Sequence, residues 1–162
     1  MTNTRLISVS LFSLILLIAA FAIPAWGQTN STDWFFKGMA LYNLNKYEES
    51  LQAYDQALAQ NPRDAEAWNG KGVDLGLLGK YDEALRAFGR ATDINSSYAE
   101  AWFNAGVIYD FQERYSEAIQ AYNMATEVNP SYQKAWINKN QDIDLIASMT
   151  PSCACKNALP EA

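Results

Sequence analysis

Residues 65–98 read AEAWNGKGVDLGLLGKYDEALRAFGRATDINSSY, and residues 99–132, which follow directly, read AEAWFNAGVIYDFQERYSEAIQAYNMATEVNPSY. The two stretches are identical at 15 of 34 aligned positions, which tandem duplication explains and chance does not. The same step of 34 residues separates four tryptophans: Trp34, Trp68, Trp102 and Trp136. A period this strict is typical of stacked copies of one structural unit, so the sequence predicts a repeat protein.

Each repeat contains two apolar stripes with the spacing of an α-helix. In residues 65–98 the first stripe consists of Trp68, Gly72 and Leu75, and the second consists of Ala84, Phe88 and Ala91. Spacings of three and four residues place such side chains on one helical face. Gly79 lies between the stripes, where a glycine lets a helix end and the chain reverse. Each repeat is therefore predicted to be a pair of antiparallel helices, with Trp68 in its core and Gly72 allowing the second helix to approach closely.

Start and stop signals divide the chain into seven predicted helices. They are expected near residues 31–45, 48–60, 65–78, 82–94, 99–112, 116–128 and 133–147. Asp64 is expected to cap the helix that follows it, and Ser97-Tyr98-Ala99-Glu100 has the spacing of a capping box. The seventh helix has no later partner and is rich in polar residues, as is typical of a helix that caps an open stack. Its Asp142 and Asp144 are expected on a solvated face.

The repeating columns of Trp, Gly, Tyr, Ala and Pro resemble the tetratricopeptide repeat. The resemblance covers residues 31–147, as repeats 31–64, 65–98 and 99–132 and a capping helix at 133–147. Lys37, Lys71 and Lys139 replace the leucine of the pattern. Because lysine stems can cover apolar surface, we expect these replacements to change the surface and not the fold. The resemblance implies an all-α fold, a right-handed α-solenoid of antiparallel helix pairs.

The resemblance also implies a function, in which the concave face lined by the first helices holds a peptide segment of a partner protein. It implies no catalysis and no cofactor. The residues expected to line this groove are Phe35, Met39, Tyr42, Asn69, Val73, Leu77, Phe103, Asn104, Val107, Phe111, Lys134, Ile137 and Asn138. For any single one of them, burial against the adjacent repeat is the alternative. A clamp for a C-terminal carboxylate is not expected, since Val73 replaces an asparagine of that motif and Asn138 replaces a basic residue.

The N-terminal 27 residues have the layout of an export signal. Arg5 precedes a stretch at 6–23 that has no charged residue, and Pro24 and small residues follow before Gln28. This pattern predicts a signal peptide cleaved after Gly27, or an uncleaved membrane anchor as the alternative. In both cases residues 28–147 and the tail at 148–162 are expected outside the cytoplasmic membrane, since Arg5 stays inside.

Composition excludes several classes of function. The chain has no histidine, so a serine triad, a cysteine–histidine pair and a histidine metal site are excluded. A net charge of −6 would repel a phosphate backbone, which makes nucleic acid an unsuitable partner. Cys153 and Cys155 form a Cys-Ala-Cys motif in the predicted flexible tail, too few ligands for a metal site. Two other hypotheses stay open: a thiol redox protein acting through these cysteines, and a structural subunit of an envelope complex.

Overall fold

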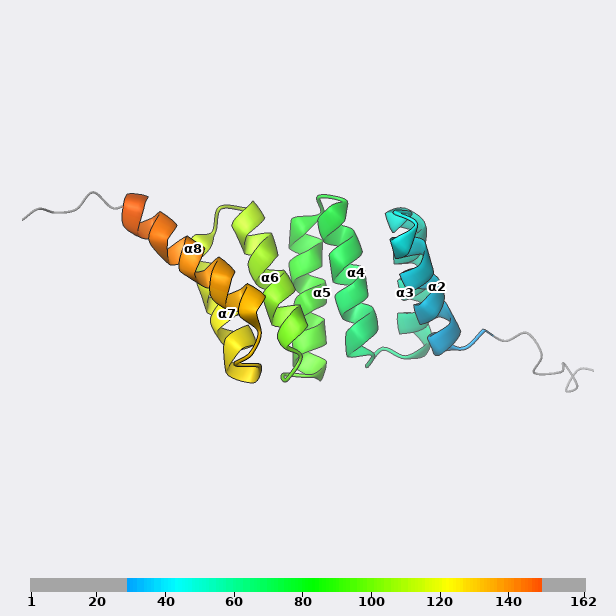
Figure 1. The fold of residues 1–162 in the computed structure, drawn as a ribbon. Helices are drawn as coiled ribbons and strands as arrows, with labels where there is room; N and C mark the ends of the chain where they lie inside the picture. The colour runs from blue at the N-terminus through cyan, green and yellow to red at the C-terminus, as the bar shows by residue number, and fades with distance from the viewer. Residues whose placement is uncertain (1–28, 150–162) are drawn as a thin grey trace, which may run out of the picture. The chain divides into compact units, whose positions relative to one another are not determined.

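The computed structural model describes residues 29–149, and residues 31–149 form seven consecutive helices joined by short turns (Figure 1). The helices are α2 (Ser31–Asn43), α3 (Tyr47–Gln60), α4 (Ala65–Leu77), α5 (Tyr81–Ile94), α6 (Ala99–Phe111), α7 (Tyr115–Val128) and α8 (Gln133–Met149). No helix within residues 29–149 is long and apolar enough to span a bilayer. The predicted export segment and the Cys-Ala-Cys motif lie outside the described residues.

The second helices, α3, α5 and α7, each begin one residue before the position expected from the sequence. They begin at the repeated tyrosines Tyr47, Tyr81 and Tyr115 because the preceding residue already accepts the first helical hydrogen bond. The Ala84 amide, for example, donates to the Lys80 carbonyl over 3.0 Å. The last helix, α8, runs two residues beyond its expected end.

The two predicted helix caps have different outcomes. Asp64 caps α4 as expected, with the Ala67 amide donating to Asp64 Oδ1 over 3.0 Å. The capping box predicted from Ser97 is wrong. Tyr98 occupies the cap position of α6 without a side-chain bond, and the Ser97 amide instead donates to Asn95 Oδ1 over 3.1 Å.

Equivalent turns join the two helices of each repeat. Asn45, Gly79 and Glu113 occupy the same position in these turns, and their φ angles are 57°, 73° and 58°. The left-handed conformation suits glycine and is tolerated by asparagine. Glu113 is therefore strained, and Gly79 is not.

The core of each repeat is an aromatic ring of the second helix packed on a glycine of the first. Phe88 on α5 is 1% exposed, and a Cβ atom at Gly72 would lie 2.5 Å from Phe88 Cε1. Gly106 meets Tyr122 in the same way in the next repeat. The predicted role of the glycine column is thus confirmed, because no side chain fits between the two helices.

The tryptophans are less buried than expected. Trp68 is half-buried at the edge of its helix pair, and its indole Nε1 donates to the Pro62 carbonyl over 3.0 Å. The Lys71 ammonium lies over the Trp68 ring at 5.3 Å, and Lys37 and Lys139 cover Trp34 and Trp136 in the same manner. The tryptophans therefore lie at the edge of the core. Lysine side chains cover the rings of Trp34, Trp68 and Trp136.

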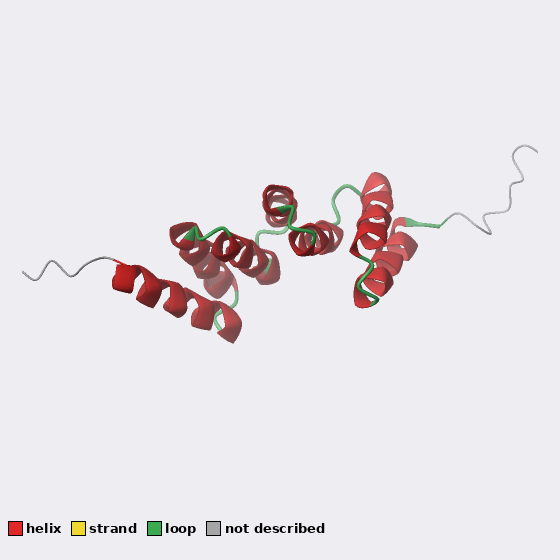
Figure 2. Ribbon diagram, turned by 90° about the horizontal axis from the view of Figure 1, so that it is seen from above, coloured by secondary structure: helices red, strands yellow, loops and turns green. Residues whose placement is uncertain are grey.

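Neighbouring repeats pack through two kinds of contact. The second helix of one repeat contacts the first helix of the next, and the first helices α2, α4 and α6 also contact each other in order. Figure 2 shows the same helices from above, with short loops between them. The first helices thus form one continuous layer.

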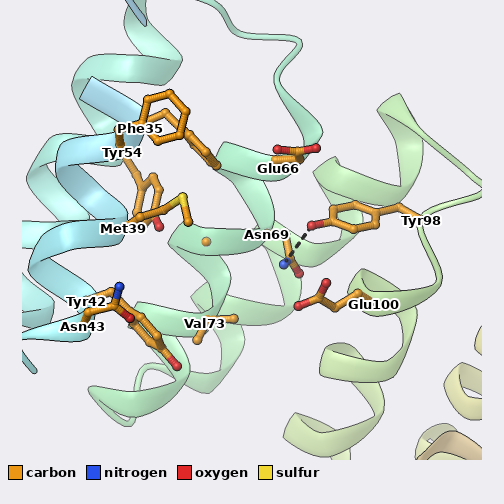
Figure 3. Close-up of a pocket in the computed structure, with 12 residues that line it drawn as sticks. Phe35, Met39, Tyr42, Asn43, Tyr54, Glu66, Asn69, Val73, Tyr98 and Glu100 are labelled. Carbon is orange, nitrogen blue, oxygen red and sulfur yellow. Dashed lines mark hydrogen bonds between the residues drawn. The ribbon is translucent and has the colours of Figure 1, made fainter. Parts of the chain in front are cut away.

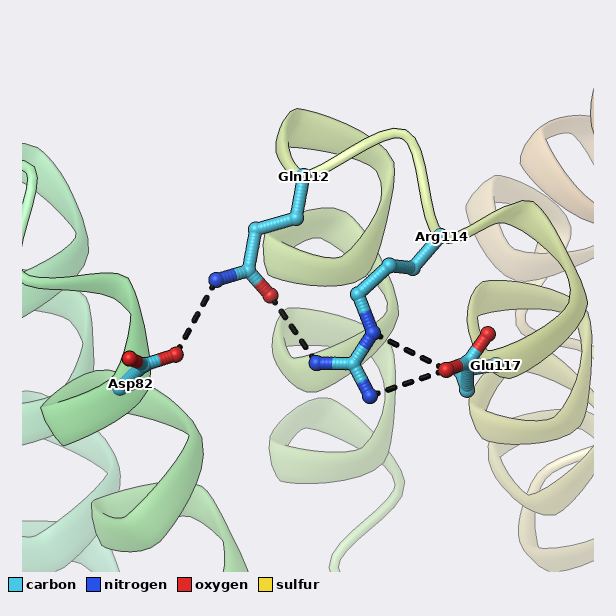
Figure 4. A network of polar contacts seen from close by, with 4 residues as sticks. All are labelled: Asp82, Gln112, Arg114 and Glu117. Atoms are coloured by element: carbon cyan, nitrogen blue, oxygen red, sulfur yellow. Dashed lines mark hydrogen bonds and ion pairs between the residues drawn. The ribbon is translucent and has the colours of Figure 1, made fainter.

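An exposed polar network joins α5, α6 and α7 (Figure 4). Gln112 Nε2 donates to Asp82 Oδ1 over 3.2 Å, and Arg114 donates to Gln112 Oε1 over 3.3 Å. Arg114 also pairs with Glu117 at 2.9 Å and lowers the pKa of that carboxyl. Ion pairs at a solvated surface add little stability, so the buried cluster that includes Leu75, Phe88 and Ile108 carries the contact between these repeats.

Candidate functional site

A pocket of about 650 Å³ lies between the first helices of consecutive repeats (Figure 3). It spans α2, α4 and the beginning of α6, with one contribution from α3. Its lining consists of Phe35, Phe36, Met39, Tyr42, Asn43, Tyr54, Glu66, Asn69, Gly70, Val73, Tyr98 and Glu100. Five residues expected in the groove are brought together here: Phe35, Met39, Tyr42, Asn69 and Val73.

One wall of this pocket is apolar and comes mainly from α2. Phe36, Met39 and Tyr42 are 59%, 41% and 38% exposed, so large apolar side chains of α2 face solvent. Phe35 also belongs to this wall and packs on Tyr54, with the two ring centroids 5.9 Å apart. A surface of this kind usually marks a site where another molecule binds.

Gly70 lets the Tyr54 ring reach the floor of the pocket. A Cβ atom at this position would lie 2.5 Å from Tyr54 Cζ, so the tyrosine ring occupies the space that a side chain would need. Phe36, Asn104 and Asn138 hold the equivalent positions on the other first helices, and none of them is small. The pocket therefore depends on one glycine that the repeat pattern does not require.

A chain of hydrogen bonds across two repeats leads to Asn69 and Tyr98 on the opposite wall. Asn104 Nδ2 donates to Asn69 Oδ1 over 3.0 Å, and Asn69 Nδ2 donates to the Tyr98 hydroxyl over 3.3 Å. Asn69 is buried, and both ends of its amide are engaged by these neighbours. Its role is to fix Tyr98 at the pocket, where burial and then the nearby Glu100 and Glu66 raise the pKa of Tyr98 to about 12.

The other residues expected in the groove lie outside this pocket. Leu77, Phe111 and Ile137 are more than half exposed, and Phe111 stacks on Tyr81 with the ring planes 7° apart. Phe103 packs on Tyr122 and Tyr132, and Val107 belongs to the same partly buried group. Lys134 is exposed at the beginning of α8.

Asn138 faces a buried polar cluster between α6, α7 and α8. Its Nδ2 donates to the Tyr122 hydroxyl over 3.2 Å, and that hydroxyl donates to Asp110 Oδ2 in a short hydrogen bond. Asp142 lies beside Asp110 and is 6% exposed, so its expected place on a solvated face is wrong. Burial, and then the charge of Asp110, raise the pKa of Asp142 to about 7. Asp144 is exposed.

Asp74 is a second buried carboxyl, at the position of α4 that Asp142 occupies in α8. It is 0% exposed, and within residues 29–149 neither carboxyl oxygen has a hydrogen-bond partner. The Ser50 hydroxyl near it donates to the Gly38 carbonyl over 2.9 Å. Burial raises the pKa of Asp74 to about 6, although Ser50 offsets part of this effect. In α6 the equivalent residue is Ile108. Of these three equivalent positions in α4, α6 and α8, only the one in α6 therefore holds an apolar residue.

Sequence reasoning missed the other seven residues of the pocket: Phe36, Asn43, Tyr54, Glu66, Gly70, Tyr98 and Glu100. The glutamates carried a signal, because the repeated Ala-Glu-Ala-Trp places them 34 residues apart at the beginning of two first helices. Tyr54 and Tyr98 carried none, since they come from a second helix and a turn. Their approach to the groove depends on how the repeats stack.

Models of the tetratricopeptide repeat match residues 99–132, and TPR-repeat models match residues 38–73 and 77–110. The chain therefore belongs to the tetratricopeptide repeat family, and its fold is the expected α-solenoid. Repeats of this fold are generally non-enzymatic, and the chain is a scaffold for protein–protein interaction. No curated protein matches the sequence.

Solved structures agree with this fold. MamA superposes with a TM-score of 0.70 at 19% identity, over 73% of this chain and 69% of MamA. YrrB, described as a TPR protein with an unusual peptide-binding site, gives 0.67 at 29% identity over 70% of this chain and 59% of YrrB. The first TPR domain of Spaghetti, bound to the HSP90 peptide SRMEEVD, gives 0.70 at 19% identity over 73% and 94%.

Proposed function

We propose that this protein is a non-enzymatic adaptor that holds a peptide segment of a partner protein outside the cytoplasmic membrane. The binding site is the pocket formed by α2, α4 and the beginning of α6. The observation that carries this proposal is the wall of exposed Phe36, Met39 and Tyr42 beside a pocket of about 650 Å³. The described binding of peptides by YrrB and by the Spaghetti domain supports it.

The size of the pocket suits a short segment of extended chain. Its lining comes from three consecutive repeats, so an occupant must contact several first helices together. An extended peptide offers side chains on alternating sides, and one of these rows can pack on the apolar wall. In the third repeat the ring of Tyr132 packs edge-on against Phe103, whereas Asp64 holds the equivalent position in the first repeat, and this restricts deep binding to the N-terminal half of the array.

The test is capture of partners from the native envelope with the full chain as bait, compared with Phe36→Ala/Met39→Ala. Both side chains are exposed, so the variant is expected to fold and to lose the captured partner. Leu44→Ala/Met124→Ala removes a similar exposed apolar area elsewhere and should retain it. A partner captured equally by all three proteins places binding outside the pocket and contradicts the proposal.

The location has its own test. The basis for an extracytoplasmic site is the sequence pattern at 1–27, which lies outside the described residues. Alkaline phosphatase fused after Met149 should be active in cells, because this enzyme folds only where its disulfides form. An inactive fusion that is present at normal abundance would place the repeats in the cytoplasm.

A further inference from the structure

We propose that the pocket selects peptide segments in which lysine or arginine lies next to a large apolar residue. The cation is recognised by the carboxylates of Glu66 and Glu100, and the apolar side chain by the wall from α2. This inference rests on the proposed function, because it names the chemistry of the peptide that the same pocket holds.

The two glutamates lie together on one side of the pocket. Glu66 is in the first turn of α4 and Glu100 is in the first turn of α6, and both are exposed. Figure 3 shows their carboxylates with Tyr98 on the side of the pocket opposite Phe35 and Met39. An occupant between the walls therefore meets apolar surface on one side and negative charge on the other.

Neither carboxylate is neutralised by another residue within 29–149. Within residues 29–149, Glu66 and Glu100 make no ion pair or side-chain hydrogen bond, and no lysine or arginine lines the pocket. Both charges contribute to raising the pKa of Tyr98, so their fields meet at its hydroxyl. A cationic group placed there would gain from both carboxylates and would meet no competing cation from the described lining of the pocket.

The side chain at the repeated position of Glu66 and Glu100 changes from acidic to basic along the array. Lys134 occupies in α8 the position that Glu66 and Glu100 occupy in α4 and α6. A bound segment is thus expected to place its basic residue over the second and third repeats and not over the capping helix. The chain itself carries a net charge of −6, so a second copy of it is a less complementary occupant than a basic segment.

An extended peptide can contact the apolar wall and the two glutamates at the same time. Successive side chains of an extended segment point to opposite sides, so adjacent residues reach opposite walls. An alternating peptide with apolar residues toward Met39 and Phe36 presents the residues between them to Glu66 and Glu100. The segment predicted to bind is therefore of the form apolar–basic–apolar.

The test uses three fluorescein-labelled peptides of equal length, in which leucine alternates with arginine, glutamine or glutamate. Binding to the full chain is measured by fluorescence anisotropy at low and at moderate salt. The arginine peptide is expected to bind about tenfold more tightly than the glutamine peptide, with the preference decreasing as salt increases. The glutamate peptide is expected to bind most weakly.

The matched variants separate charge selectivity from binding itself. Glu66→Gln/Glu100→Gln should reduce the affinity for the arginine peptide about fivefold to tenfold and leave the glutamine peptide unchanged. Glu83→Gln/Glu127→Gln removes two exposed charges from the second helices and should change neither affinity. Melting followed by circular dichroism verifies that each variant is folded.

The remaining outcomes are distinct. Equal binding of the arginine peptide by the wild type and by Glu66→Gln/Glu100→Gln overturns the charge preference. The proposed function then survives only if Phe36→Ala/Met39→Ala abolishes that binding. Failure of all three peptides to bind overturns both proposals. Self-association that Glu66→Gln/Glu100→Gln removes, seen by sedimentation velocity, would assign the pocket to a second copy of the chain and overturn the choice of occupant.

Discussion

Replacement of Asp74 by asparagine tests the most unusual feature of the core, a fully buried carboxyl group without a hydrogen-bond partner in the described part of the chain. Asparagine has nearly the same shape and cannot ionise. The protonated aspartic acid and the amide should therefore be similar in the folded state. The ionised carboxylate should be much less stable there, because burial removes its hydration.

The magnitude follows from the raised pKa. Burial moves the pKa of Asp74 from 3.8 to about 6, and this shift of roughly two units corresponds to ~3 kcal/mol. Because the folded-state pKa is the higher one, the stabilising contribution is complete below about pH 4 and is lost as the pH rises through about 6. Integrated between about pH 5 and pH 8, the loss is about 1.4 kcal/mol.

The assay is urea unfolding followed by far-ultraviolet circular dichroism at about pH 5 and about pH 8, for the wild type and Asp74→Asn. The free energy of unfolding of the variant, relative to the wild type, should rise by about 1.4 kcal/mol between these two conditions. All other groups titrate alike in the two proteins, so the difference isolates Asp74. Asp93→Asn, which removes an exposed carboxylate, should show no such rise. A difference between Asp74→Asn and the wild type that does not vary with pH would refute the reasoning.

Four further changes have definite expected outcomes. Asp142→Asn should slow amide hydrogen exchange of α8 at about pH 8 and have little effect at about pH 5, because the wild-type contribution is lost as the pH rises through about 7. Gly72→Ala should lower the free energy of unfolding by ~1–3 kcal/mol in urea unfolding, since its Cβ would press on the Phe88 ring. Gly89→Ala, where no described atom outside the adjacent residues and the backbone of its own helix lies within 4 Å of the new Cβ, should instead raise the free energy of unfolding by up to ~1 kcal/mol, and destabilisation there would contradict the packing. Glu113→Gly should raise the melting temperature, with a gain of ~1 kcal/mol, because it relieves a left-handed residue, and a decrease would show that the turn is not strained.

The candidate site was only partly predictable from the sequence. The residues one and five positions after Trp34 and Trp68 were expected in the groove, and Phe35, Met39, Asn69 and Val73 do line the pocket. Helical periodicity alone places them on one face. The same periodicity gave no reason to separate Phe103 from Phe35, yet the ring of Tyr132 packs edge-on against Phe103, whereas Asp64 holds the equivalent position in the first repeat.

The sequence by itself determined the repeat, the order and approximate bounds of the helices, and the need for glycine at Gly72 and the equivalent positions of the repeats. These features depend on local periodicity and on steric contacts within one helix pair, so each repeat encodes them separately. Only the tertiary structure decided which of the equivalent residues are buried. The side chains around Asp142 and Asp74 come partly from a neighbouring repeat. An amphipathic pattern on one helix cannot show which side chains the next helix packs against it. The pocket has the same origin, because it exists only where Gly70, Tyr54 and Tyr98 from different elements meet.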